Sequence, residues 1–263
     1  MPTYDTIGPI HAIVEFGSGE AGIEAGPGEQ TSVEVRPADT SRPADVALAE
    51  QTEITYADGT LTVRSPREAA RGWSSKQPPS VIVTIRLPAE SKLTADAYFG
   101  SVRATGSFGD VEARTSHGDI SLEETAGVRA HSEHGAITIT RPIGVAEIAT
   151  NGNVRIGEAG STVRIEAGSG DIDIDRVQAD LNATSAHGNI RIARLVSGTA
   201  VLETGYGAVS VGVARTTAAD VDVNSGHGAV RDSLETGRAP IHTDAKAAIH
   251  ARTTYGDIDV HRA

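Results

Sequence analysis

Four histidines stand directly before glycines that recur along the chain, and their side chains could bind a metal ion. They are His117, His134, His187 and His227. A zinc site needs three or four ligands in one shell, and imidazole nitrogens are common ligands. Phe, Asn, Ser or Tyr occupies the same position in other copies, and no carboxylate or third imidazole is placed to complete a shell. We therefore expect no metal site and no cofactor.

Aspartates directly follow several of the same glycines and could bind calcium. They are Asp110, Asp119, Asp171 and Asp257. The calcium-binding nonapeptide repeat also places aspartates in adjacent turns, but it needs paired glycines and an aspartate in nearly every turn. Here Ala or Asn often stands in that position. Because Asp and Asn favour turns by bonding their own backbone, we expect these residues to cap their own turns.

Charged residues at exposed strand positions raise the question of a glycosidase-type site. The set is Glu112, Arg129, Arg155, Arg164, Asp173 and Arg191. Its mixture of signs predicts ion pairs between neighbouring strands rather than the convergent pair of carboxylates that glycoside hydrolysis needs. The sequence contains no cysteine, no G-x-S-x-G, no P-loop and no zinc-protease motif. We expect a protein that is not an enzyme and has no catalytic residues.

All of these residues belong to one motif that returns along the chain: a turn residue, glycine, a small residue and an apolar residue. The glycines are Gly100, Gly109, Gly118, Gly135, Gly152, Gly170, Gly188, Gly207, Gly228 and Gly256, so that subtraction gives intervals of 9, 9, 17, 17, 18, 18, 19, 21 and 28 residues. Apolar residues alternate after each glycine, as in Ile172 and Ile174, and before it, as in Val163 and Ile165. A period of two is typical of a strand with one buried face.

Two strands and two corners fill one interval of about 18 residues, which matches one coil of a narrow β-helix. Composition supports an all-β chain, because 29 glycines and 11 prolines among 263 residues interrupt long helices. The sequence thus predicts a single-stranded parallel β-helix, or β-solenoid, with an irregular β cap at its N-terminal end. One coil is out of step: Glu147 falls on an inward position while Ile148 does not, so we expect a bulge or register shift before Gly152.

The regular repeat predicts two regions, a cap over residues 1–90 and repeats over residues 91–263. A solenoid leaves an unpaired strand edge at its end, and the last strand, Asp257–Val260, is guarded by charge alone. We therefore expect self-association through this end. Two loops break the rhythm, Ser65–Ser80 and Asp232–Ala245. Loops on a repetitive scaffold often bind partners, and Arg71, Trp73 and Lys76 are the candidate binding residues of the first one.

Charge and hydropathy bear on partners and location. The formal net charge of −12 disfavours phosphate backbones and anionic lipids, so we expect neither nucleic acid nor membrane as a partner. The sequence has no run of about 20 apolar residues. Because its first residues lack a basic segment followed by an apolar run, we expect a cytoplasmic protein without a signal peptide or membrane insertion.

The repeated turn-Gly-Asp-Ile motif, the opening Met1–Thr6, the strand Val33–Pro37 and the closing Arg252–Ile258 are similar to a known set of sequences. They resemble a bacterial family of β-strand-repeat proteins, labelled "putative adhesin", with a domain of unknown function. The resemblance covers essentially the whole chain. It implies a single-stranded β-helix and no known catalytic residues.

These observations favour a non-catalytic interaction or scaffold protein that presents β-faces and irregular loops to a protein partner or to itself. The alternative is a carbohydrate-binding or carbohydrate-active β-helix protein, which would hold sugars on an open sheet face.

Overall fold

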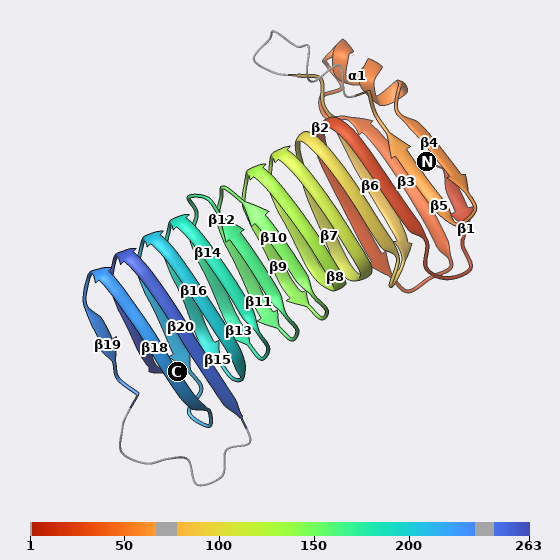
Figure 1. The fold of residues 1–263 in the computed structure, drawn as a ribbon. Coiled ribbons are helices and arrows are strands. Elements are labelled where there is room, and N and C mark those ends of the chain that lie inside the picture. Colours follow the sequence, from red (N-terminus) through yellow and green to blue (C-terminus); the bar gives the residue numbers. More distant parts are fainter. Residues whose placement is uncertain (1, 67–77, 235–244) are drawn as a thin grey trace. The chain divides into compact units, whose positions relative to one another are not determined.

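The computed structural model describes residues 2–66, 78–234 and 245–263. The chain forms two compact units, residues 1–135 and residues 136–263. Both consist almost entirely of strands (Figure 1). In the part of the chain that the structure describes, no helix has the length and apolar character to cross a bilayer. The predicted division at residue 90 stays a prediction.

The first unit contains one helix and eight strands among its described residues. They are β1 (Thr3–Asp5), β2 (His11–Gly26), β3 (Gln30–Pro37), α1 (Pro43–Glu50), β4 (Glu53–Ala57), β5 (Thr60–Arg64), β6 (Val81–Pro88), β7 (Lys92–His117) and β8 (Ile120–His134). On one side, β2 pairs in parallel with β5 and β6, and on the other with β7, which in turn pairs with β8. The strands β1, β3 and β4 add antiparallel pairings, which gives this unit its irregular part.

Helix α1 is held to the first unit by a carboxylate that takes no part in the repeat. Pro43 begins the helix, where a missing N–H costs nothing. Asp45 is fully buried and lies 3.3 Å from the guanidinium of Arg42. Its two oxygens also accept hydrogen bonds from the backbone N–H groups of Asp39 and Ser80, at 3.2 and 3.3 Å. This carboxylate therefore ties the segment that leads into α1 to Ser80, the residue before β6.

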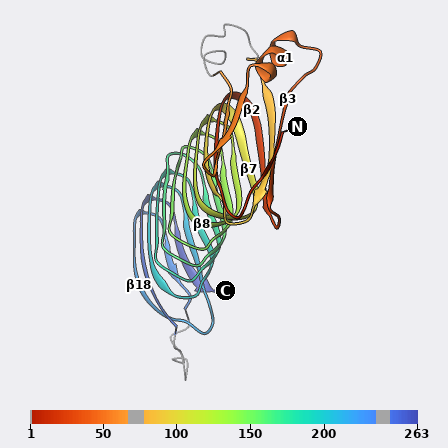
Figure 2. The same cartoon turned by 90° about the vertical axis from the view of Figure 1, so that its right-hand side faces the viewer.

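The second unit is built from strands that alternate between two parallel ladders. Their bounds are β9 (Ile137–Pro142), β10 (Ala146–Thr150), β11 (Val154–Ala159), β12 (Val163–Ala167), β13 (Ile172–Val177), β14 (Leu181–His187), β15 (Ile190–Leu195), β16 (Gly198–Tyr206), β17 (Val209–Val213), β18 (Ala218–His227), β19 (Val230–Asp232), β20 (Lys246–Tyr255) and β21 (Ile258–Arg262). One ladder runs β10, β12, β14, β16, β20 and β18, and the other runs β9, β11, β13, β15, β17, β21 and β19. Figure 2 shows the coils of this unit as overlapping loops.

This arrangement confirms the predicted single-stranded parallel β-helix with coils of about 18 residues. Residues one coil apart share a row: Ile172 pairs with Val154 on one side and with Ile190 on the other, and all three are buried. Corner glycines stack as well. A Cβ added to Gly188 would overlap the carbonyl oxygen of Gly170, so the corner accepts glycine because backbone packs against backbone there.

The coil before Gly152 is shifted as the sequence indicated. Ala146, Ile148 and Thr150 point inward, whereas the exposed side of the strand carries Glu147. Thr150 pairs with Ala167 of the next coil. Because Thr150 lies one residue nearer to Gly152 than Ala167 lies to Gly170, this corner is one residue shorter.

The coils at the end of the second unit do not follow chain order. Strands β20 and β21 lie between β16–β17 and β18–β19, as the dark blue β20 of Figure 1 shows. The expectation that Asp257–Val260 forms the exposed last strand is therefore wrong: Ile258 and Val260 are fully buried. The reason is apolar content. The inserted coil carries isoleucines at inward positions, whereas the outer coil offers valines and ends in Asp232.

Candidate interaction surface

The outer coil, β18 and β19, forms the end of the second unit and is its most open part. Val221 and Val223 are half-buried, and Val230 is 46% exposed. Ile249 and Ile258, which pair with Val221 and Val230 in the inserted coil, are fully buried. Within the described ranges, β18 is paired by β20 on one side only. The end coil therefore presents a strand edge whose backbone groups can accept another strand.

Stacked rings line the corner next to this edge. His187, Tyr206, Tyr255 and His227 follow one another with ring centroids 5.1, 4.9 and 4.7 Å apart. Their planes differ by 3°, 5° and 12°, so each inner ring covers the faces of its neighbours. The edges of Tyr206 and Tyr255 remain about half exposed. Such a column offers ring edges along its length, and both faces of its two inner rings, Tyr206 and Tyr255, are covered by neighbours.

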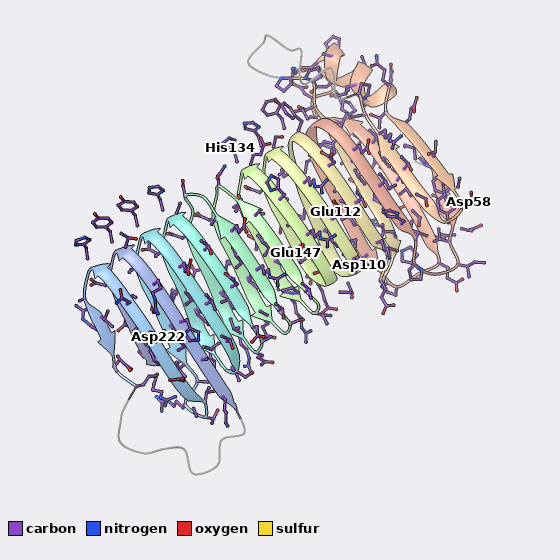
Figure 3. All side chains as sticks on the ribbon, in the orientation of Figure 1. Asp58, Asp110, Glu112, His134, Glu147 and Asp222 are labelled. Atoms are coloured by element: carbon purple, nitrogen blue, oxygen red, sulfur yellow. The ribbon has the colours of Figure 1, made fainter. Side chains whose placement is uncertain are left out.

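The histidines singled out in the sequence are thus split between two columns. In the first unit His117 and His134 lie 5.0 Å apart, centroid to centroid, after Phe99 (Figure 3). In the second unit two tyrosines separate His187 from His227. Over residues 2–66, 78–234 and 245–263, no group of three or more His, Asp or Glu side chains is arranged to hold a metal ion.

Asp171, Asn189 and Asp257, which follow corner glycines, have a different role from the predicted one. Asp171 accepts a hydrogen bond from the backbone N–H of Asn189 at 2.7 Å, and Asn189 accepts one from Ala208 at 2.9 Å. Each side chain therefore caps the following coil rather than its own turn. Asp257 likewise accepts a hydrogen bond from the backbone N–H of Ala229 at 2.8 Å. The coil of residues 218–232 therefore lies outside the coil of residues 246–262.

An acidic and a basic strand meet on the outer face beside the open edge. Asp222 of β18, labelled in Figure 3, lies 2.7 Å from the guanidinium of Arg252 and 3.6 Å from the imidazole of His250. Arg252 also donates to the backbone carbonyl of Asp222 at 3.0 Å. The hydrogen bond from Arg252 lowers the pKa of Asp222 below 3.8, and the same bond raises the pKa of Arg252.

This cluster does not form a convergent acid pair. All three side chains are about half exposed. On the other side of β20, Glu203 of β16 lies opposite Arg252. Arg252 therefore stands between Glu203 on one neighbouring strand and Asp222 on the other. This pattern favours ordered strand pairing.

The other charged positions form pairs of the expected kind. Arg191 lies 3.6 Å from Asp173 on the neighbouring strand, and Arg164 lies 4.0 Å from Glu147. Glu112 pairs with Arg114 on its own strand at 2.7 Å and lies opposite Arg129 of β8.

The predicted loop residues Arg71, Trp73 and Lys76 lie outside the described residues. The candidate surface that the structure offers instead, the β18–β19 edge, was missed because the sequence suggested that the last strand forms the end. The sequence did contain a signal. The next inward position after Val230 is Asp232, whereas the next inward position after Ile258 is Val260.

Comparisons with known proteins find one matching family model and several similar solved structures. A family model described as "Toastrack DUF4097" matches residues 15–263. A structure described as a "putative adhesin" from Bacteroides fragilis is 11% identical, with 98% of this chain and 95% of that chain covered and a TM-score of 0.43. A second "putative adhesin", from Parabacteroides distasonis, is 15% identical, with 100% and 95% covered and a TM-score of 0.37. No curated protein matches the chain.

Proposed function

The chain belongs to the Toastrack DUF4097 family, and from this premise we propose that it is a non-catalytic β-solenoid protein that binds other protein chains. The observation that carries the proposal is the open edge of the β18–β19 coil. An unpaired strand edge is a template for strand addition, in which backbone hydrogen bonds give affinity and alternate side chains give specificity.

The partner that fits this edge is an extended segment that alternates apolar and basic residues. Strand β20 already pairs with the opposite side of β18 and has this pattern, with Ile249 inward and His250 and Arg252 outward. The outward residues of β18 include Asp220 and Asp222. A basic strand on the free side would complement these carboxylates, and its apolar residues would cover Val221, Val223 and Val230.

One feature supports a role without catalysis, and another bears on carbohydrate binding. The ionisable cluster of Asp222, His250 and Arg252 is bonded within itself and half exposed, whereas catalytic groups are commonly desolvated. The alternative of carbohydrate binding finds no support in the two inner corner rings, because stacked neighbours cover both faces of Tyr206 and Tyr255.

A peptide-binding titration tests the proposal. The probe is a fluorescent ten-residue peptide that alternates lysine and valine, and a glutamate–valine peptide is its control. We expect saturable binding of the lysine peptide that weakens with salt, and a loss of about tenfold in affinity with Val230→Lys. Val145→Lys is the matched variant, since Val145 is 49% exposed and lies away from β18–β19. Equal binding to both variants, or equal binding of both peptides, would contradict the proposal.

A further inference from the structure

The inserted coil, residues 246–262, occupies a slot between two coils that are close neighbours in sequence. Strand β17 ends at Val213 and β18 begins at Ala218, so four residues connect a coil on one side of the slot to the coil on the other. Neighbouring strands lie about 4.8 Å apart, and this connection therefore rises past two coil spacings instead of one. The chain thus skips one coil position between β17 and β18, and residues 246–262 fill this position.

The walls of the slot match each other in register. Ile249 pairs with Ala200 of β16 and with Val221 of β18, and Tyr255 pairs with Tyr206 and His227 in the same way. Without the inserted coil, β18 could therefore pair directly with β16, with inward residues facing inward on both strands. If the inserted coil leaves, the edges of β16 and β18 can therefore pair with each other. This pairing lowers the cost of the departure.

The slot selects its occupant by charge as well as by shape. The outward residues of β20 include Lys246, His250 and Arg252, while Glu203 faces it from β16 and Asp222 from β18. On the other ladder, Arg262 donates hydrogen bonds to the carbonyl oxygens of Ala214 and Thr217, at 3.0 and 2.9 Å.

Those two carbonyls belong to the connection that climbs past the inserted coil. Arg262 thus recognises the feature that the slot creates, and Ala263 adds a backbone hydrogen bond to Val213 at 2.9 Å. Every one of these contacts joins residues 246–263 to residues 198–232 through strand edges and side chains. A second copy of the chain offers the identical segment.

We propose that residues 246–262 are an exchangeable coil, so that the slot of one molecule also accepts this coil from a second copy. Exchange of an identical element is a low-cost route to a dimer, because the same contacts form between molecules as within one. The inference rests on the proposed strand-binding function and names the partner as another copy of this chain. It concerns the slot, whereas the peptide test concerns the outer edge of β18.

Disulfide trapping tests the exchange, and the absence of natural cysteines makes every product unambiguous. Glu203 and Arg252 are direct neighbours on parallel strands, a spacing that a disulfide can bridge. The double variant Glu203→Cys/Arg252→Cys first establishes that this bond closes within one chain. The single variants Glu203→Cys and Arg252→Cys are then mixed, incubated, oxidised and separated on a non-reducing gel.

We expect a disulfide-linked dimer from the mixture whose yield rises with incubation time and protein concentration. Thr184→Cys mixed with Arg252→Cys is the matched control, because Thr184 lies two rungs from Arg252 and should give background levels. A dimer yield equal to this control, while the double variant closes fully, would overturn the inference. Excess lysine–valine peptide should leave the dimer yield unchanged, because it addresses the outer edge of β18 and not the slot, which separates this result from failure of the outer edge to bind peptide.

Discussion

Tyr206 and Tyr255 stack with ring centroids 4.9 Å apart and planes within 5° of each other, although the whole coil of residues 218–232 separates them in the sequence. His227, from that skipped coil, stacks on Tyr255. Together these two ring contacts show the order of the last three coils. In this order the more apolar coil, residues 246–262, lies inside, where its isoleucines are buried. The coil of residues 218–232, which carries valines, lies at the edge.

The coil order gives a first prediction. Arg252→Cys/Asn224→Cys should form an internal disulfide, because these residues are paired neighbours on β20 and β18. Glu203→Cys/Asn224→Cys should not, since β20 lies between them and two rungs exceed the reach of a disulfide. Mass measurement after alkylation distinguishes the two. The reverse outcome would mean that the coils stack in chain order.

Corner glycines give a second prediction. In Gly188→Ala the new methyl group meets the carbonyl oxygen of Gly170, and overpacking of this kind lowers the free energy of unfolding by about 1–3 kcal/mol. Gly160→Ala is the control, because its Cβ meets no atom within 4 Å. Urea unfolding of both variants measures the difference. Equal midpoints would show that the corners do not need glycine.

Asp45 gives a third prediction. Asp45→Ala removes a buried carboxylate that bonds Arg42 and two backbone N–H groups, and we expect a loss of about 1.5–3 kcal/mol in stability. Glu50→Ala, at an exposed position on the same helix, should change stability by less than about 0.5 kcal/mol. Thermal unfolding followed by circular dichroism compares them, and equal melting temperatures would argue against the anchoring role.

The pair of Asp222 and Arg252 gives a pH prediction. Because the pKa of Asp222 is lowered in the folded state, its carboxylate contributes stability above the unfolded value near 3.8 and loses this contribution as pH falls through the folded value. Melting temperatures of the native protein and Asp222→Asn should therefore differ slightly at pH 7 and converge below about pH 3. The difference should also shrink in 1 M salt. A difference that grows as pH falls would have the wrong sign.

Much of the architecture is readable from the sequence, because a motif with a fixed period allows few arrangements. The glycine spacing predicted coils of about 18 residues, and the displaced Ile148 predicted the shifted corner before Gly152. The position of α1 and its anchor Asp45 was not predictable, since neither belongs to the repeat.

The coil order was missed for a different physical reason. Residues 218–232 and 246–262 have the same register of inward and outward positions, so either coil can follow β16–β17 without a mismatch. The larger inward side chains of residues 246–262, and contacts such as those of Arg262 with Ala214 and Thr217, separate the two orders. The open edge, and with it the candidate interaction surface, depends on that small difference, while the predicted loop residues 71, 73 and 76 bear no relation to it.

The four-residue link between Val213 and Ala218 has a consequence for how the protein is made. A ribosome delivers residues 218–232 before residues 246–262, yet the earlier segment reaches its final place only above the later one. The second unit therefore cannot mature by laying each newly synthesised turn on the one before. The observed order requires residues 246–262 to come to lie between two coils that are both synthesised before them.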